Sequence, residues 1–138
     1  MTSTQIAIVR STWRKVSPMQ QRVAQVFYER LFELDPSTRA FFGGVDLRHH
    51  GRKLTETLSA VIELLDQPED LLETVGDAGR RHGSRGVGWR HYGMAADALF
   101  TALECCLGPA FTTEARAAWS VAYWVAARAM QRAAAQVA

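Results

Sequence analysis

Two histidines, His50 and His82, are the residues whose side chains and spacing could bind a metal ion or polarise a bound ligand. A neutral imidazole offers a nitrogen lone pair that binds transition metals, iron included, and its second ring nitrogen can make a hydrogen bond. A competing interpretation places His82, which follows Arg80 and Arg81, at a solvated helix end, and His50 beside His49 could equally lie on the surface. Spacing therefore suggests a site without establishing it.

The spacing of apolar residues predicts two helices that would bring these histidines toward each other. From a potential N-cap at Asp46, apolar residues at helical spacing form one stripe that ends before Pro68, so His50 lies near the start of that helix. A weaker stripe follows Pro68 and reaches His82 just before the glycine-rich stretch 83–88. On the two arms of such a hairpin, His50 and His82 would approach a flat, apolar cofactor such as haem from opposite sides.

Helical spacing of apolar residues continues through nearly the whole chain, and the alternation typical of strands is absent. A short helix is expected from Asp35 to about Phe42, and two long helices are expected at 89–107 and 112–135, the second with Thr112 as its cap. Breaks are predicted at Ser17-Pro18, Asp35-Pro36, Gly43-Gly44, Gln67-Pro68 and Gly108-Pro109. The sequence thus predicts an all-α fold of seven to eight helices of unequal length.

Bulk composition favours a soluble, cytoplasmic single domain spanning residues 1–138. Sixteen basic and 14 acidic residues are interspersed and give a formal charge of +2, which argues against a nucleic-acid partner. No apolar run approaches the ~20 residues that span a bilayer, and the N-terminus lacks the order of a signal peptide, so no membrane partner is expected. We interpret Cys105 and Cys106 as buried thiols of a reducing compartment.

A series of motifs resembles the bacterial single-domain globins, the haem domains of flavohaemoglobins and, around His50, the neuroglobin-type globins. The matching stretches occur in the same order as in that family and cover nearly the whole chain: FYERLF at 27–32, Asp35-Pro36, RAFF at 39–42, HGRKL at 50–54, GRRH at 79–82, Gly86-Val87, His91-Tyr92, Leu107-Gly108, Phe111-Thr112, and Ala118-Trp119 through Tyr123. The resemblance implies a globin fold around a b-type haem.

The resemblance also implies a role for each matching residue. His82 corresponds to the proximal ligand of the iron, and Tyr28 and His50 correspond to the two polar distal positions, where His50 is also a possible second iron ligand. Phe42 corresponds to the aromatic ring that packs on the haem face. The remaining positions that would line the haem are Leu54, Val87, Tyr92, Ala95 and Leu99. Lys53 and Arg81 could pair with the haem propionates, although long basic side chains on helices are as often simply solvated.

The function implied is reversible binding of oxygen and other diatomic gases, such as carbon monoxide and nitric oxide, for storage or transport. A hydrogen bond from Tyr28 or His50 would stabilise the partial negative charge of bound oxygen by ~1–3 kcal/mol. Many bacterial relatives have glutamine where this chain has His50, so five-coordinate and six-coordinate resting iron both remain open.

Two alternative functions remain: a nitric oxide dioxygenase that depends on an external reductase, and a gas or redox sensor. In flavohaemoglobins a tyrosine and a glutamate polarise the proximal histidine. Tyr92 matches that tyrosine, but the glutamate position falls at Ala134, so we expect weaker polarisation here. An enzymatic role is therefore not the leading expectation. We expect a monomer or a weak homodimer.

Overall fold

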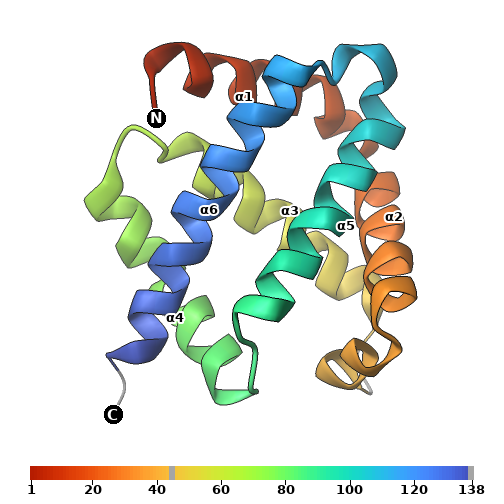
Figure 1. Cartoon of the computed structure of the whole chain (residues 1–138), viewed down its shortest axis with the longest axis vertical. Coiled ribbons are helices and arrows are strands. Elements are labelled where there is room, and N and C mark those ends of the chain that lie inside the picture. Colours follow the sequence, from red (N-terminus) through yellow and green to blue (C-terminus); the bar gives the residue numbers. More distant parts are fainter. Residues whose placement is uncertain (44–45, 137–138) are drawn as a thin grey trace.

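Helices make up the computed structural model, which describes residues 1–43 and 46–136 (Figure 1). The described residues contain no strand. The α-helices are α1 (Ser3–Val16), α2 (Gln20–Leu34), α3 (Leu47–Glu63), α4 (Pro68–Ser84), α5 (Trp89–Leu107) and α6 (Thr113–Ala135). Three 3-10 helices join them: η1 (Ser17–Met19), η2 (Pro36–Phe42) and η3 (Gly108–Ala110). The predicted all-α fold is confirmed.

Helix starts coincide with side chains that satisfy free backbone N–H groups. The Asp46 carboxylate accepts a hydrogen bond from the Arg48 N–H at 3.0 Å, and the Thr112 hydroxyl accepts one from the Ala115 N–H at 3.0 Å. Pro68 is the first residue of α4, where its missing N–H has no cost. These caps fix where α3, α4 and α6 begin, as the sequence predicted.

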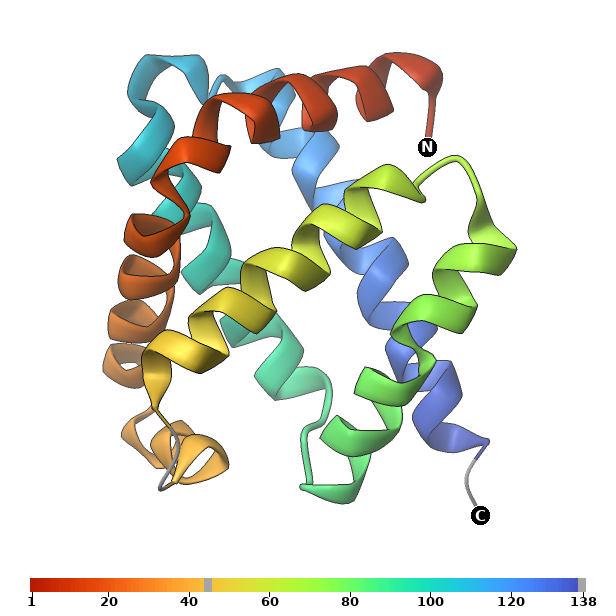
Figure 2. The same cartoon turned by 180° about the vertical axis from the view of Figure 1, so that it is seen from behind.

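The helices pack in pairs that leave α3 and α4 diverging from their short connection. In Figure 1, α4 lies beside α6 and α2 lies beside α5, while α1 runs along one end of the molecule. Figure 2 shows α3 and α4 spreading apart, so that the start of α3, the end of α4 and η2 lie at the same end of the molecule. His50 and His82 belong to those two helix ends.

Glycines allow two of these helix pairs to approach closely. At Gly79 a Cβ atom would lie 2.3 Å from the carbonyl oxygen of Met130, so only glycine lets α4 rest on the α6 backbone. At Gly51 a Cβ atom would lie 2.8 Å from the Cβ of Ala24, which brings α3 onto α2. Since Gly79 is three residues before His82 and Gly51 follows His50, both contacts help to set the position of a histidine.

Several local expectations need correction. The helix after Asp35 is a 3-10 helix, and α4 continues to Ser84, two residues beyond His82. The helix before Pro68 ends earlier than Gln67, at Glu63, where Arg10 of α1 donates to the Ile62 and Glu63 carbonyls at 3.2 and 2.9 Å.

The expectation of two buried cysteine thiols is also wrong, because Cys105 is exposed and Cys106 is half-buried. Gly44, in the predicted Gly43-Gly44 break, lies outside the described residues. Across residues 1–43 and 46–136, no helix is long and apolar enough to cross a membrane.

Candidate functional site

His82 occupies the last turn of α4 and is held by a tyrosine from the next helix. Its Nδ1 lies 3.1 Å from the hydroxyl oxygen of Tyr92 in α5. Burial, reinforced by the positive charges of Arg81 and Arg85, lowers the pKa of His82 below the ordinary histidine value. The imidazole is therefore neutral near pH 7, and neutrality is what metal ligation requires.

Tyr92 is itself fixed from α6. Its hydroxyl donates to the Met130 Sδ at 3.6 Å, and its backbone carbonyl accepts a hydrogen bond of 2.6 Å from the Tyr123 hydroxyl. Burial raises the pKa of Tyr92 to about 12, so the phenol keeps its proton. With that proton directed at sulfur, the phenol oxygen can accept from an Nδ1–H of His82. The Nε2 of His82 then carries a free lone pair.

His50 faces a cluster of aromatic rings at the start of α3. Its ring lies edge-to-face with Phe42 at a centroid distance of 5.2 Å, and Phe42 lies edge-to-face with Tyr28 at 5.3 Å. Burial, followed by the charges of Lys53, Arg85 and His49, lowers the pKa of His50. Three elements, α2, η2 and α3, thus bring the predicted distal residues Tyr28 and His50 together with Phe42, the ring predicted to pack on the haem face.

Tyr28 is buried beneath this cluster, with 6% of its surface exposed. Burial raises the pKa of its phenol to about 12, so the hydroxyl remains a hydrogen-bond donor at neutral pH. A Cβ at Gly51 would lie 3.9 Å from the Tyr28 ring. Tyr28 therefore sits directly under the turn that carries His50.

A hollow of about 510 Å³ opens between η2 and the end of α4, lined by Ala40, Phe41, Gly43 and Arg85. Arg85 follows α4, and its charge acts on both His50 and His82. The hollow therefore lies at the end of the molecule where the two histidine-bearing helices are furthest from their connection.

The other predicted site residues differ in exposure. Tyr92 and Leu99 are buried, Leu54, Val87 and Ala95 are half-buried, and Lys53 and Arg81 are exposed. Leu54 and Ala95 pack against the hydrophobic core. Half-buried apolar side chains on α3, α5 and the loop before α5 are suited to contact a bulky apolar ligand.

Sequence reasoning missed two residues, Met130 and Arg85. The contact of Met130 with Tyr92 depends on how α6 is set against α5, and no local pattern fixes that register. Arg85 could have been suspected, because it stands in the glycine-rich stretch directly after the helix of His82. Ala134, which stands at the position of the flavohaemoglobin glutamate, lies close to Gly83, where an added Cβ would be 2.8 Å from the Ala134 Cβ.

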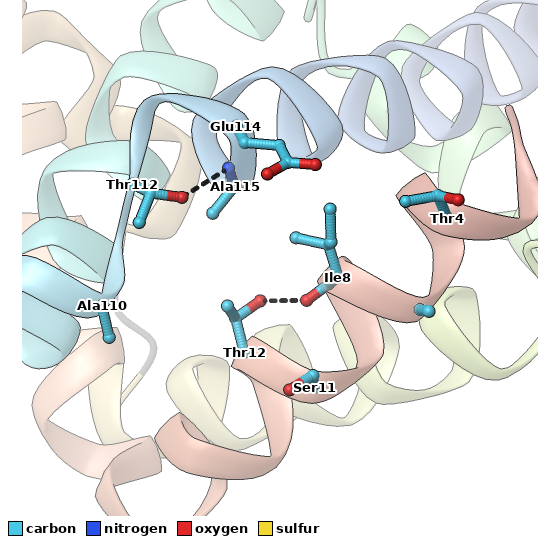
Figure 3. Close-up of a pocket in the computed structure, with 9 residues that line it drawn as sticks. Thr4, Ile8, Ser11, Thr12, Ala110, Thr112, Glu114 and Ala115 are labelled. Carbon is cyan, nitrogen blue, oxygen red and sulfur yellow. Dashed lines mark hydrogen bonds between the residues drawn. The ribbon is translucent and has the colours of Figure 1, made fainter.

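A second hollow, of about 280 Å³, lies between α1 and the start of α6 (Figure 3). Threonine and serine hydroxyls, small apolar side chains and Glu114 line it. Two of its hydroxyls are already engaged, since Thr12 donates to the Ile8 carbonyl and Thr112 caps α6. We assign this hollow no role.

The donor set around His82 and His50 fits a haem. Histidine is a common protein ligand of haem iron, and a hydrogen bond to its second ring nitrogen orients it for that role. Half-buried apolar and aromatic residues suit the macrocycle, and arginine and lysine at the rim suit its carboxylates. These requirements are met by residues of this chain.

Comparisons with known proteins agree with this geometry. The Globin family model matches residues 25–130. Neuroglobin of Danio rerio is 27% identical over 91% of this chain and 87% of its own length, and neuroglobin of Tetraodon nigroviridis is equally similar.

Among solved structures, a Rhodothermus marinus protein described as an engineered carbene transferase and a candidate nitric oxide dioxygenase superposes with a TM-score of 0.88 at 26% identity. The match covers 99% of this chain and 95% of that one. The helical fold, the paired histidines and the family match together show that this chain belongs to the globin family, whose members hold a haem iron and bind diatomic gases.

Proposed function

We propose that residues 1–138 form a single-domain globin that holds a b-type haem through the Nε2 of His82 and reversibly binds oxygen and other diatomic gases. The observation that carries the proposal is the hydrogen bond between the His82 Nδ1 and the Tyr92 hydroxyl, at 3.1 Å. That bond selects the tautomer whose Nε2 is free, and burial keeps the ring neutral. When bound, the haem supplies the iron that takes up the gas.

The residues of α2, η2 and α3 form the gas-binding side in this proposal. The Tyr28 hydroxyl and the neutral His50 imidazole are both hydrogen-bond donors within one aromatic cluster. Donation to the partly negative bound oxygen stabilises it, whereas the less polar carbon monoxide gains less. In this proposal the half-buried apolar side chains of Phe42 and Leu54 keep water from the bound gas, which would strengthen a hydrogen bond made to it.

Arginine and lysine side chains near the start of α3 and the end of α4 complete the proposed haem site. Arg85 lines the hollow beside η2, and its charge reaches both histidines. We propose Arg85 as a partner for a haem carboxylate, together with Lys53 or Arg81.

Absorption spectra of the ferric, deoxy-ferrous and oxygenated protein test this function. The parent is expected to show a Soret band and a reversible oxygenated spectrum, and His82→Ala is expected to lose haem. His49→Ala is the matched control, since His49 is exposed and precedes His50 on the same helix. A parent that remains colourless after addition of haemin would overturn the proposal.

A second candidate function is nitric oxide dioxygenation with an external reductase. The superposition on the Rhodothermus marinus protein and the Tyr92 hydrogen bond to His82 favour it. The contact between Tyr92 and the weakly accepting Met130 sulfur argues for modest polarisation of the histidine. Repeated conversion of nitric oxide to nitrate with cell extract and a nicotinamide cofactor would support this function. A single stoichiometric conversion would not, because almost any oxygenated globin gives one.

A further inference from the structure

The short helix η2 belongs to the gas-binding side and depends on its neighbours for its position. It is a 3-10 helix of seven residues, and hydrogen bonds of this type hold a segment less firmly than those of an α-helix. Phe42, its last residue, packs against the rings of Tyr28 and His50, at 5.3 and 5.2 Å. Whatever holds η2 therefore also decides where Phe42 meets these two hydrogen-bond donors.

Two contacts from the start of α5 hold η2, and both segments lie at the same end of the molecule (Figure 1). The Arg90 guanidinium forms an ion pair with the carboxylate of Asp35, the residue that caps η2. The next residue, His91, places its ring edge-to-face with Phe41 at a centroid distance of 5.0 Å. The His91 ring is fixed in turn, because its Nδ1 accepts a hydrogen bond of 3.0 Å from the Gly88 N–H. Side chains of α5 thus hold η2 near both of its ends.

Asp35 is the more covered member of the ion pair. Its side chain is 13% exposed, whereas that of Arg90 is 72% exposed. Hydrogen bonds from the Ser37 hydroxyl and N–H, at 2.6 and 2.9 Å, lower the pKa of Asp35, and the positive charge of Arg90 lowers it further. The carboxylate is therefore ionised at neutral pH. A charged group with so little access to water is stabilised by a cation, and Arg90 supplies one from α5.

The residue after His91 contacts the opposite side of the candidate site. It is Tyr92, whose hydroxyl lies 3.1 Å from the His82 Nδ1. Successive residues of an α-helix point about 100° apart, so Arg90, His91 and Tyr92 reach different neighbours from a single turn. One turn of α5 therefore contacts η2 through two residues and the proposed iron ligand through the third.

We propose that Arg90 and Asp35 are positioning residues for gas binding. Their ion pair holds η2 against the start of α5, and through Phe42 it keeps Tyr28 and His50 where they can donate to a bound gas. The inference rests on the proposed haem binding by His82. Neither member of the pair contacts the gas in this proposal, so breaking the pair should change how long oxygen stays bound without changing the bond between iron and His82.

Two substitutions break the ion pair and change the local charge in opposite directions. Arg90→Gln removes a positive charge, and Asp35→Asn removes a negative charge while asparagine can still cap η2. If charge alone governed oxygen release, the two variants would have opposite effects. Under our proposal both release oxygen about 2- to 5-fold faster than the parent, the effect of losing one ion pair, and Arg90→Lys retains most of the parent behaviour. Stopped-flow replacement of oxygen by carbon monoxide gives the rates, and opposite effects would overturn the inference.

Arg30→Gln is the matched control for the ion pair. Arg30 pairs with Asp97 of α5 at 3.0 Å, but it belongs to α2 and not to η2, so this variant should release oxygen at the parent rate. A double-mutant cycle with Phe42→Leu tests the route, because Arg90→Gln should add little once the Phe42 ring is gone. Additive effects in this cycle would overturn the inference. So would a shifted iron–histidine stretching band in Arg90→Gln, which would show that Arg90 acts through Tyr92.

Hydrogen–deuterium exchange of the haem-free protein tests the same contact without a bound gas. Peptides that cover residues 36–42 should exchange faster in Arg90→Gln and Asp35→Asn than in the parent, and at the parent rate in Arg30→Gln. Unchanged exchange of η2 in both variants would overturn the inference. If the parent takes up no haem, the proposed function fails and the role of the ion pair in gas binding fails with it; a Soret band with parent-like oxygen release in both variants overturns this inference alone.

Discussion

The two sides of the candidate site are built differently. On the side of α4, His82 is hydrogen-bonded to Tyr92, and the helix that carries it rests on the α6 backbone at Gly79. On the side of α3, the His50 ring packs edge-to-face with Phe42, and the neighbouring Gly51 lies against the side-chain methyl group of Ala24. His82 is thus fixed by a directional hydrogen bond and by the backbone contact of its helix, whereas His50 is held by apolar packing alone.

This difference separates two chemical requirements. An iron ligand must keep one tautomer and one orientation, and a directional hydrogen bond enforces both. A residue that stabilises a bound gas, or that binds the iron until a gas displaces it, must be able to adjust, and aromatic packing allows small movements. The structure therefore supports the assignment of His82 to the fixed role and His50 to the adjustable one.

The largest expected effect is a loss of stability when the contact between Gly79 of α4 and the α6 backbone is disrupted. Gly79→Ala places a Cβ against the Met130 carbonyl oxygen, which cannot move without shifting α6, and should lower the free energy of unfolding by about 3 kcal/mol. Gly51→Ala meets no backbone atom: its Cβ would lie 2.8 Å from the Ala24 methyl group and in ordinary contact with the Tyr28 ring at 3.9 Å, so it should cost less, about 1–2 kcal/mol. Urea unfolding of the haem-free proteins measures both.

Gly93→Ala is the control for both variants, because a Cβ there meets no atom within 4 Å and Gly93 lies inside α5. Alanine should raise the stability by ~0.5–1 kcal/mol through its helix propensity. If Gly51→Ala proved more damaging than Gly79→Ala, the contrast between a rigid and an adjustable side would be wrong.

The next effect concerns oxygen release from the side of His50. His50→Ala removes a hydrogen-bond donor from the aromatic cluster, so oxygen should dissociate roughly 5- to 30-fold faster, equivalent to about 1–2 kcal/mol. Tyr28→Phe is the companion variant, and stopped-flow replacement of oxygen by carbon monoxide gives the rates. Faster release in Tyr28→Phe alone would transfer the donor role to the tyrosine.

In the deoxy-ferrous parent, sharp split visible bands that vanish in His50→Ala would show His50 bound to the iron.

Local sequence signals predicted where these helices begin, because the interactions that start a helix lie within a few residues of one another. Asp46 and Thr112 cap helices through N–H groups two or three residues away, and Pro68 begins α4 where expected. The clustering of His50 with Phe42 was foreseen only through family resemblance, since residues on different helices meet in three dimensions.

Interactions between distant segments explain what the sequence did not predict. Met130 contacts Tyr92 from 38 residues away in the sequence, and Arg10 donates to the Ile62 carbonyl at the end of α3 from 52 residues away. Neither contact leaves a trace in hydrophobic periodicity, which reports which face of a helix is buried but not what it meets. Exposure of Cys105 has the same origin, because a cysteine at the end of a helix is buried or not according to its neighbours.

A smaller effect should appear in the pH dependence of the haem-free protein. Burial lowers the pKa of both histidines in the folded state, while the unfolded chain takes up a proton near the ordinary value of ~6.5. The unfolded state therefore binds more protons below that value. The stability that the neutral histidines contribute is therefore fully present above pH ~6.5, and it is lost as the pH falls through their folded-state pKa.

Because His82 is the more buried of the two, His82→Gln should remove more of this acid sensitivity than His50→Gln. Thermal unfolding of the haem-free variants between pH 7.5 and 5 measures the difference. A steeper loss of stability in His82→Gln than in the parent would show that protonation of His82 does not destabilise the folded state.

The smallest expected effect tests how firmly His82 is fixed from α6. Tyr92→Phe removes the acceptor of the Nδ1–H bond and should shift the iron–histidine stretching band of the deoxy-ferrous protein to lower frequency in resonance Raman spectra. Met130→Leu keeps that bond but removes the sulfur that accepts the Tyr92 proton, so it should shift the band in the same direction by less. Met94→Leu, a methionine of the same helix as Tyr92, is the control and should leave the band in place. If Met130→Leu shifted the band as far as Tyr92→Phe, the thioether rather than the phenol would determine the orientation of the histidine.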